Sequence, residues 1–149
     1  MNITFIMRCS TFLFISTLCF MKDSTSAKIW IKNENISEFV THKGTNYKVD
    51  ALKVLFINEK GKKGPLYTLP LIELPLYQSI EKILPKDTYS KITVSLKLKK
   101  SADITHLCSI DKEHKISVSD KTTLHLGVSY EENGLECTLA YYEDPEMAP

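Results

Sequence analysis

Two cysteines and two histidines in the second half of the chain belong to the residue types that bind metal ions. Cys108 follows His106 by two residues, and Cys137 follows His125 by twelve. Two thiolates and two imidazoles make up a tetrahedral zinc set. However, His125 and Cys137 fall on opposite phases of alternating sequence patterns, so their side chains should point to opposite faces. We expect no metal site and predict a Cys108–Cys137 disulfide, with two free thiols or an intermolecular bridge as alternatives.

Signatures of catalysis are missing from the sequence. It contains no Gly-x-Ser-x-Gly elbow, no His-Glu-x-x-His pair and no glycine-rich loop that could hold a phosphate. No spacing of carboxylates marks an acid–base pair, and the acidic residues of 143–149 are expected to form a solvated C-terminal tail. We therefore predict a non-enzymatic protein without a cofactor; a hydrolase of unrecognised type is the alternative.

The most unusual stretch is an apolar run punctuated by Pro65, Pro70 and Pro75. Each proline removes a backbone donor, so we expect an edge strand or a long apolar loop rather than a central strand. This segment either covers one open end of the core or forms a hydrophobic mouth for a lipid or a partner protein. Its candidate surface residues are Leu66, Tyr67, Leu69, Leu71, Ile72, Leu74, Leu76 and Tyr77.

Charge is divided unevenly along the chain. Residues 43–100 hold 12 lysines and 5 acidic residues, whereas residues 101–149 hold 3 lysines and 10 acidic residues. Strands from the two halves could lie side by side and neutralise each other. Alternatively, one surface faces an anionic partner such as a glycan or a lipid headgroup. The lysines of that candidate patch are Lys60, Lys62, Lys63, Lys97, Lys99 and Lys100.

Residues 1–27 read as a secretory signal peptide. Arg8 precedes an apolar run from residue 9 to 21, and Thr25 and Ala27 give a small-x-small cleavage pattern, which predicts a cut after Ala27. An uncleaved anchor is the alternative, and no later stretch is apolar enough for a stable membrane span. Removing the signal removes the chain's one arginine, so nucleic-acid binding is not expected. The sequon at Asn35, completed by Ser37, predicts N-glycosylation of an extracellular protein.

Period-two alternation is the clearest structural pattern. In 91–99, apolar residues alternate with lysines and hydroxyl residues, which predicts a half-buried strand. Alternating runs at 122–130 and 135–141 flank Asn133-Gly134, which predicts a β-hairpin. Further strands are expected at 28–32, 47–57, 104–110 and 115–119, and helical spacing at 77–84 predicts one short helix. We expect 28–142 to form a single-domain antiparallel β-sandwich, immunoglobulin-like or similar, with a small β-barrel as the alternative.

The run from Leu124 to Tyr141, with its Asn-Gly turn and Leu135-Glu136-Cys137, resembles the closing hairpin of MD-2-related lipid-recognition proteins. These are secreted β-sandwiches that hold a lipid between their sheets. The further cysteine pairs of that family are absent here, and the resemblance covers under a quarter of the mature chain. It implies only that a chain of this kind could hold an apolar ligand between two sheets. Our leading prediction is a secreted protein that binds an extracellular or cell-surface protein, and the alternative is a small lipid carrier.

Overall fold

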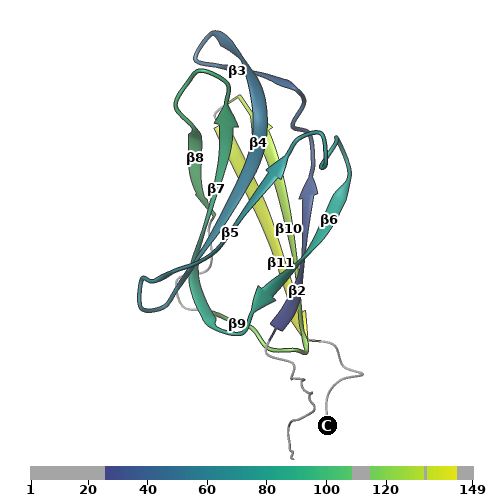
Figure 1. Cartoon of the computed structure of the whole chain (residues 1–149), viewed down its shortest axis with the longest axis vertical. Helices are drawn as coiled ribbons and strands as arrows, with labels where there is room; N and C mark the ends of the chain where they lie inside the picture. The colour runs from purple at the N-terminus through teal and green to yellow at the C-terminus, as the bar shows by residue number, and fades with distance from the viewer. Residues whose placement is uncertain (1–25, 109–114, 133, 144–149) are drawn as a thin grey trace, which may run out of the picture.

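The computed structural model describes residues 26–108, 115–132 and 134–143, and the side chains of these residues up to Tyr141. Most of the predicted signal, residues 144–149 of the acidic tail and Asn133 of the hairpin turn lie outside these residues. The described chain folds into two β-sheets that pack face to face and are not closed into a barrel (Figure 1). The all-β fold and its sandwich arrangement are therefore confirmed.

The first sheet has four strands in the order β11-β10-β2-β6. β10 and β11 form the predicted hairpin, and β2 lies between β10 and β6. β2 runs parallel to β10 but antiparallel to β6, so this sheet is mixed rather than purely antiparallel. The strands are β2 (Ser26–Asn33), β6 (Ser79–Pro85), β10 (Thr122–Glu131) and β11 (Gly134–Glu143).

The second sheet has six strands built on the central pair β4 and β7. On the side of β4 that faces away from β7, β3 pairs with the first part of β4 and β5 pairs with the second part. The proline-rich β5 therefore lies at a sheet edge. The expectation of an edge position for this segment is thus met by β5. The strands are β3 (Phe39–His42), β4 (Thr45–Asn58), β5 (Lys63–Pro70), β7 (Thr88–Leu98), β8 (Ile104–Cys108) and β9 (Ile116–Ser117).

Alternating side chains from both sheets fill the space between them. On β7, every second residue from Ile92 to Leu98 is buried, as the sequence alternation predicts. The long β4 departs from strict alternation, because its pairing with β7 shifts register between Val49 and Ala51. Such a bulge lets successive residues turn inward. The fully buried core residues include Ile29, Ile31, Leu52, Val54, Phe56, Ile92, Leu96 and Leu124.

The predicted helix at 77–84 is wrong, and no helix occurs in the described residues. β6 occupies this stretch and pairs with β2 from Ser79 to Pro85. Ile80 and Leu84 are four residues apart, a spacing that a helix face and a strand face share. Ile83 lies on the opposite face and is 58% exposed, so the stretch follows the strand period.

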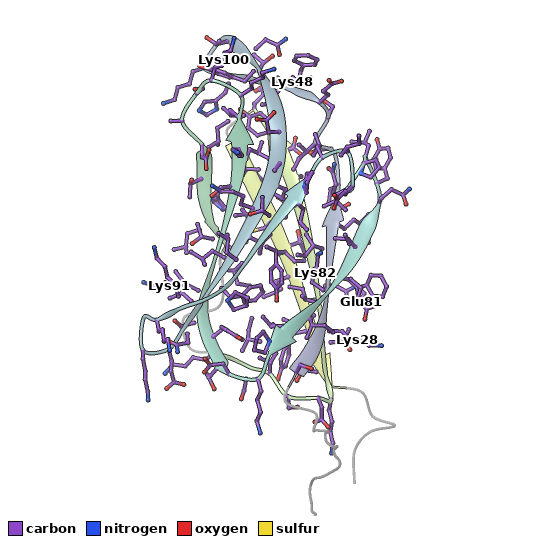
Figure 2. The ribbon with its side chains drawn as sticks, in the orientation of Figure 1. Lys28, Lys48, Glu81, Lys82, Lys91 and Lys100 are labelled. Atoms are coloured by element: carbon purple, nitrogen blue, oxygen red, sulfur yellow. A yellow bond between two sulfur atoms is a disulfide. The ribbon has the colours of Figure 1, made fainter. Side chains whose placement is uncertain are left out.

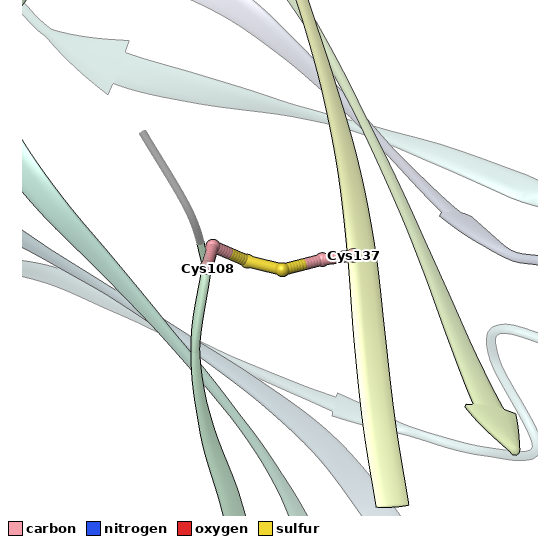
Figure 3. The surroundings of a disulfide bond; sticks show 2 residues. All are labelled: Cys108 and Cys137. Atoms are coloured by element: carbon pink, nitrogen blue, oxygen red, sulfur yellow. A yellow bond between two sulfur atoms is a disulfide. The ribbon is translucent and has the colours of Figure 1, made fainter. Parts of the chain in front are cut away.

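Cys108 and Cys137 form the predicted disulfide, which joins β8 of the second sheet to β11 of the first (Figure 3). Cys108 is buried and its Cα lies 5.8 Å from that of Cys137. The bridge therefore ties the two sheets together at one side of the sandwich. No helix among the described residues has the length and apolarity to cross a membrane.

Candidate functional site

The loop that follows β5 is fixed in place by a buried asparagine. Asn33, the last residue of β2, is fully buried, and its Nδ2 donates hydrogen bonds to the carbonyls of Ile36 (2.8 Å) and Leu74 (3.1 Å). Its Oδ1 accepts from the Ile36 N–H at 2.6 Å. The Asn33 backbone also accepts from Tyr77 N and donates to Gln78 O. Every polar atom of this residue thus has a partner, and the loops 34–38 and 71–78 are held against each other.

The apolar residues of the proline-rich segment separate into two groups. Leu69 and Leu74 are buried in the core, as a covering role predicts, and Leu71 is half-buried against it. Ile72 is 89% exposed, however, and Tyr77 is 66% exposed. The remaining predicted residues are Leu66, exposed on β5, Leu76, partly exposed, and Tyr67, half-buried on β5.

A groove of about 590 Å³ opens beside the exposed residues of this loop. One wall comes from the loop after β5, and the other comes from the loop after β2 and the first half of β4. An ion pair between Lys48 Nζ and Glu38 Oε2 (3.1 Å) lies at its rim. The lining residues are Ile36, Ser37, Glu38, Lys48, Val49, Asp50, Leu71, Ile72, Pro75 and Leu76. The structure therefore brings four apolar residues of the loop after β5 together with a charged rim in one open site.

Tyr77 has a backbone conformation that is costly for a side chain with a Cβ. Its φ is +67°, in the left-handed region. The Tyr77 N–H donates to the Asn33 carbonyl at 2.8 Å, which holds this geometry. Non-glycine residues in the left-handed region persist only where the surroundings impose them, and they cluster at functional sites.

Two tyrosines close the side of the sandwich between β5 and β6. The Tyr67 hydroxyl donates to the Ile83 carbonyl, and the Tyr89 hydroxyl donates to the Pro85 carbonyl at 2.7 Å. Burial raises the pKa of Tyr67 to about 12, with a smaller contribution from Tyr89. Burial, followed by the negative charge of Asp87, raises the pKa of Tyr89 to about 12. Both hydroxyls donate hydrogen bonds to backbone carbonyls of the edge strand β6, so their role is structural.

The six lysines of the candidate anionic-partner patch do not form one surface. Lys60, Lys62 and Lys63 lie at the β4–β5 turn, beyond Asn58. The other three, Lys97, Lys99 and Lys100, lie at the opposite end of β4, where Lys99 N donates to Lys48 O; Figure 2 shows Lys48 and Lys100 at that end. Because the two ends of the β4–β7 pairing are nine residues apart, roughly 30 Å separates the groups. Antiparallel pairing thus splits the patch in two.

The two cysteines and two histidines considered as zinc ligands lie on different parts of the sandwich. Cys108 and Cys137 bridge each other inside the sandwich, whereas His125 lies on the outer face of the first sheet and stacks on Trp30. Within the described part of the chain, no group of three His, Cys, Asp or Glu side chains is close enough to hold a metal ion.

Asn35 lies on the surface, with its side chain paired to β10. Its Oδ1 accepts from Tyr130 N at 2.7 Å, and its Nδ2 donates to Tyr130 O at 3.2 Å and to Glu131 Oε1 at 3.3 Å. The predicted glycosylation atom is therefore exposed but already hydrogen-bonded.

Sequence reasoning missed Asn33 and Trp30. Asn33 continues the inward phase of Ile29 and Ile31, and a polar residue in that phase predicts a buried hydrogen-bonding role. Trp30 lies on the outward phase, where a large aromatic side chain is unusual. Both could have been found by following the alternation of β2 to its end.

No protein-family model matches the sequence, and no curated protein matches it. Among solved structures, an NMR structure of a protein from Eubacterium rectale is similar, with a TM-score of 0.41 and 15% sequence identity. The match covers 77% of this chain and 88% of that chain.

Proposed function

We propose that this chain is a secreted, non-enzymatic protein that binds an extracellular protein through the groove beside Ile72. The observation that carries the proposal is the contrast between an 89% exposed isoleucine and the buried network that fixes its loop. When a partner covers an apolar side chain that an ordered backbone holds in water, the burial of its apolar surface stabilises the complex.

The fixed loop favours binding energetically. A partner that docks on a mobile loop must offset the entropy lost when the loop becomes ordered, which weakens the complex. Here Asn33 already joins the loop to β2. Apolar anchors at the centre of an interface, surrounded by a polar rim, dominate binding energy in protein complexes.

The rim of the groove indicates the chemistry of the partner. Glu38 and Asp50 lie on it with one lysine, Lys48, which is paired to Glu38. This leaves an excess of negative charge, so the partner segment should present an apolar side chain next to a basic residue.

A protein partner fits this groove better than a lipid acyl chain. The groove is open to solvent, with charged residues on its rim, which is typical of protein interfaces. Between the sheets, Phe56, Ile29 and Leu124 are fully buried against other side chains. An acyl chain placed between the sheets would have to displace these side chains, whereas the groove is already open. Lipid carriage remains the alternative outcome of the test.

The disulfide and the leader-like residues 1–27 support an extracellular location, since disulfides persist in oxidising compartments. N-terminal sequencing of protein recovered from culture medium would test export and the cut after Ala27. Substrate turnover that is lost when His106 or His125 is mutated would contradict the non-enzymatic proposal.

Selection from a phage-displayed random peptide library tests the binding proposal. We expect the peptides that bind the immobilised protein to combine an apolar anchor with a basic residue. These peptides should not bind the Ile72→Asp variant. Leu107→Asp is the matched control, because Leu107 is 54% exposed on β8, outside the groove. Equal binding to both variants, or no enriched peptide, would overturn the proposal. Co-purified lipid in native mass spectra, or binding to phosphatidylcholine vesicles that Ile72→Asp abolishes, would establish the lipid alternative instead.

A further inference from the structure

The outer face of the first sheet carries an aromatic pair that faces solvent. Trp30 on β2 and His125 on β10 are neighbours in the strand register, with ring centroids 6.4 Å apart and ring planes inclined by 29°. His125 is exposed and Trp30 is partly exposed. Tryptophan usually buries most of its large apolar surface. The pair therefore presents part of its ring surface to solvent.

A hollow of about 200 Å³ lies beside this aromatic pair. It exists because the neighbouring positions are small. Gly127 follows His125 by two residues on the same face of β10, and it lies between Lys32 on β2 and Thr138 on β11. Ala140, opposite His125, is also small. The hollow thus has backbone and small side chains below and ring surface along one side.

Both hydrogen-bond donors and acceptors border the hollow. A Cβ added to Gly127 would lie 2.5 Å from Glu34 Oε2, so the Glu34 carboxylate lies over this glycine. The other oxygen of Glu34 is 3.3 Å from Lys32 Nζ. The hydroxyl residues Ser79 and Thr138 complete the polar lining.

We propose that this hollow binds a neutral sugar, one pyranose ring of an extracellular glycan. A pyranose ring has an apolar C–H face, which packs on an aromatic ring, and a rim of hydroxyls that both donate and accept hydrogen bonds. The rim of the hollow offers the same combination of a carboxylate, an ammonium group and hydroxyls. A cation would be attracted by Trp30 and Glu34 but repelled by Lys32, and an anion would be repelled by Glu34. A neutral polar ring avoids both conflicts.

This sugar site shares no lining residue with the groove beside Ile72. The two proposals can therefore fail separately.

Trp30 provides a direct reporter, because it is the single tryptophan of the chain. The purified protein would be titrated with the methyl glycosides of glucose, galactose, mannose, N-acetylglucosamine and N-acetylgalactosamine. Tryptophan fluorescence and the Trp30 indole N–H resonance would be followed. We expect a saturable change for at least one glycoside, with a Kd on the order of millimolar, since one face of a small polar ring is contacted.

Gly127→Ala is the decisive variant. The three atoms nearest to the added methyl all belong to the flexible Glu34 side chain, so this carboxylate must move from its place over residue 127 while the fold and the Tm should be retained. We expect binding of the same glycoside to weaken at least about tenfold. Thr123→Ala, on the same face of β10 but outside the hollow, should bind as the unmodified protein does.

Three results would overturn the sugar site. One is the lack of a saturable change with any of the five glycosides. Another is equal affinity of Gly127→Ala and Thr123→Ala for a glycoside that binds. The third is tighter binding of choline than of any of the five glycosides, which would make the hollow a cation site.

Discussion

Asn33 and Leu74 are joined by a hydrogen bond from Asn33 Nδ2 to the Leu74 carbonyl, 3.1 Å long and spanning 41 residues of sequence. This bond connects the end of a central strand of one sheet to the loop that leaves the edge of the other. It explains why Leu74 turns inward while Ile72, two residues earlier, remains in water. The groove proposed as a binding site therefore depends on a residue outside it.

Replacing Asn33 with alanine should destabilise the protein by about 3 kcal/mol. The change leaves the buried Ile36 N–H and the Ile36 and Leu74 carbonyls without their side-chain partner, and each unsatisfied group costs about 1–3 kcal/mol. Urea denaturation followed by circular dichroism measures this loss. Asn46→Ala, at an exposed position of β4, is the control and should lie within about 0.5 kcal/mol of the unmodified protein. Equal stability of the two variants would contradict the role of Asn33.

Two apolar residues of the same loop should respond very differently to truncation. Leu74 is fully buried, so Leu74→Ala should cost about 2–5 kcal/mol through lost packing and the cavity left behind. Ile72 is 89% exposed, so Ile72→Ala should change the free energy of unfolding by less than about 0.5 kcal/mol. Thermal melts of both variants provide the measurement. A large loss of stability for Ile72→Ala would show that this side chain packs in the fold and is not available to a partner.

The sequence predicted the strands in which buried and exposed residues alternate, because this alternation can be recognised within a single short segment. The stretch 91–99 and the hairpin 122–141 are examples, and they correspond to β7, β10 and β11. β6 was predicted as a helix because Ile80 and Leu84 satisfy both periods. Only its pairing with β2 decides between them.

The binding surface could be located only in part. The segment 65–77 was identified by its prolines and apolar residues, but which of its side chains face solvent depends on the distant Asn33. Likewise, the lysines that were grouped into one patch lie at two ends of the second sheet. The positions of these lysines depend on the direction in which each strand runs, and amino-acid composition does not reveal that direction.

Removal of the disulfide should lower stability without changing the fold. The bridge closes a loop with a sequence separation of 29, so Cys108→Ala/Cys137→Ala should lose about 3–4 kcal/mol in the chain-entropy model. Urea denaturation with and without dithiothreitol measures the effect. The reductant should destabilise the unmodified protein and leave the double variant unaffected. A double variant as stable as the oxidised protein would mean that the bridge contributes no net stability.

Stability should fall at alkaline pH because of Tyr67 and Tyr89. Their pKa values are raised from 10.0 to about 12 in the folded protein, so the folded state holds these protons more tightly than the unfolded state. This contribution is fully present below pH 10 and is lost as the pH rises toward about 12. Tyr67→Phe should show a shallower loss of unfolding free energy between about pH 10 and about pH 12. Identical slopes for the variant and the unmodified protein would contradict the raised pKa of Tyr67.

Glycosylation at Asn35 can be separated from its structural role through Ser37. Asn35 Nδ2 donates both of its hydrogens, and attachment of a glycan would replace one of them, with the longer bond to Glu131 the one expected to be lost. Ser37→Ala removes the sequon but leaves the Asn35–Tyr130 pairing in place. In a eukaryotic secretory host we expect Ser37→Ala to lose the mass that a peptide glycosidase removes from the unmodified protein. Ser37→Thr retains the sequon and should keep that mass. If the unmodified protein and Ser37→Thr both carry no removable mass, the hydrogen-bonded Asn35 amide is not an acceptor, and its pairing with Tyr130 is purely structural.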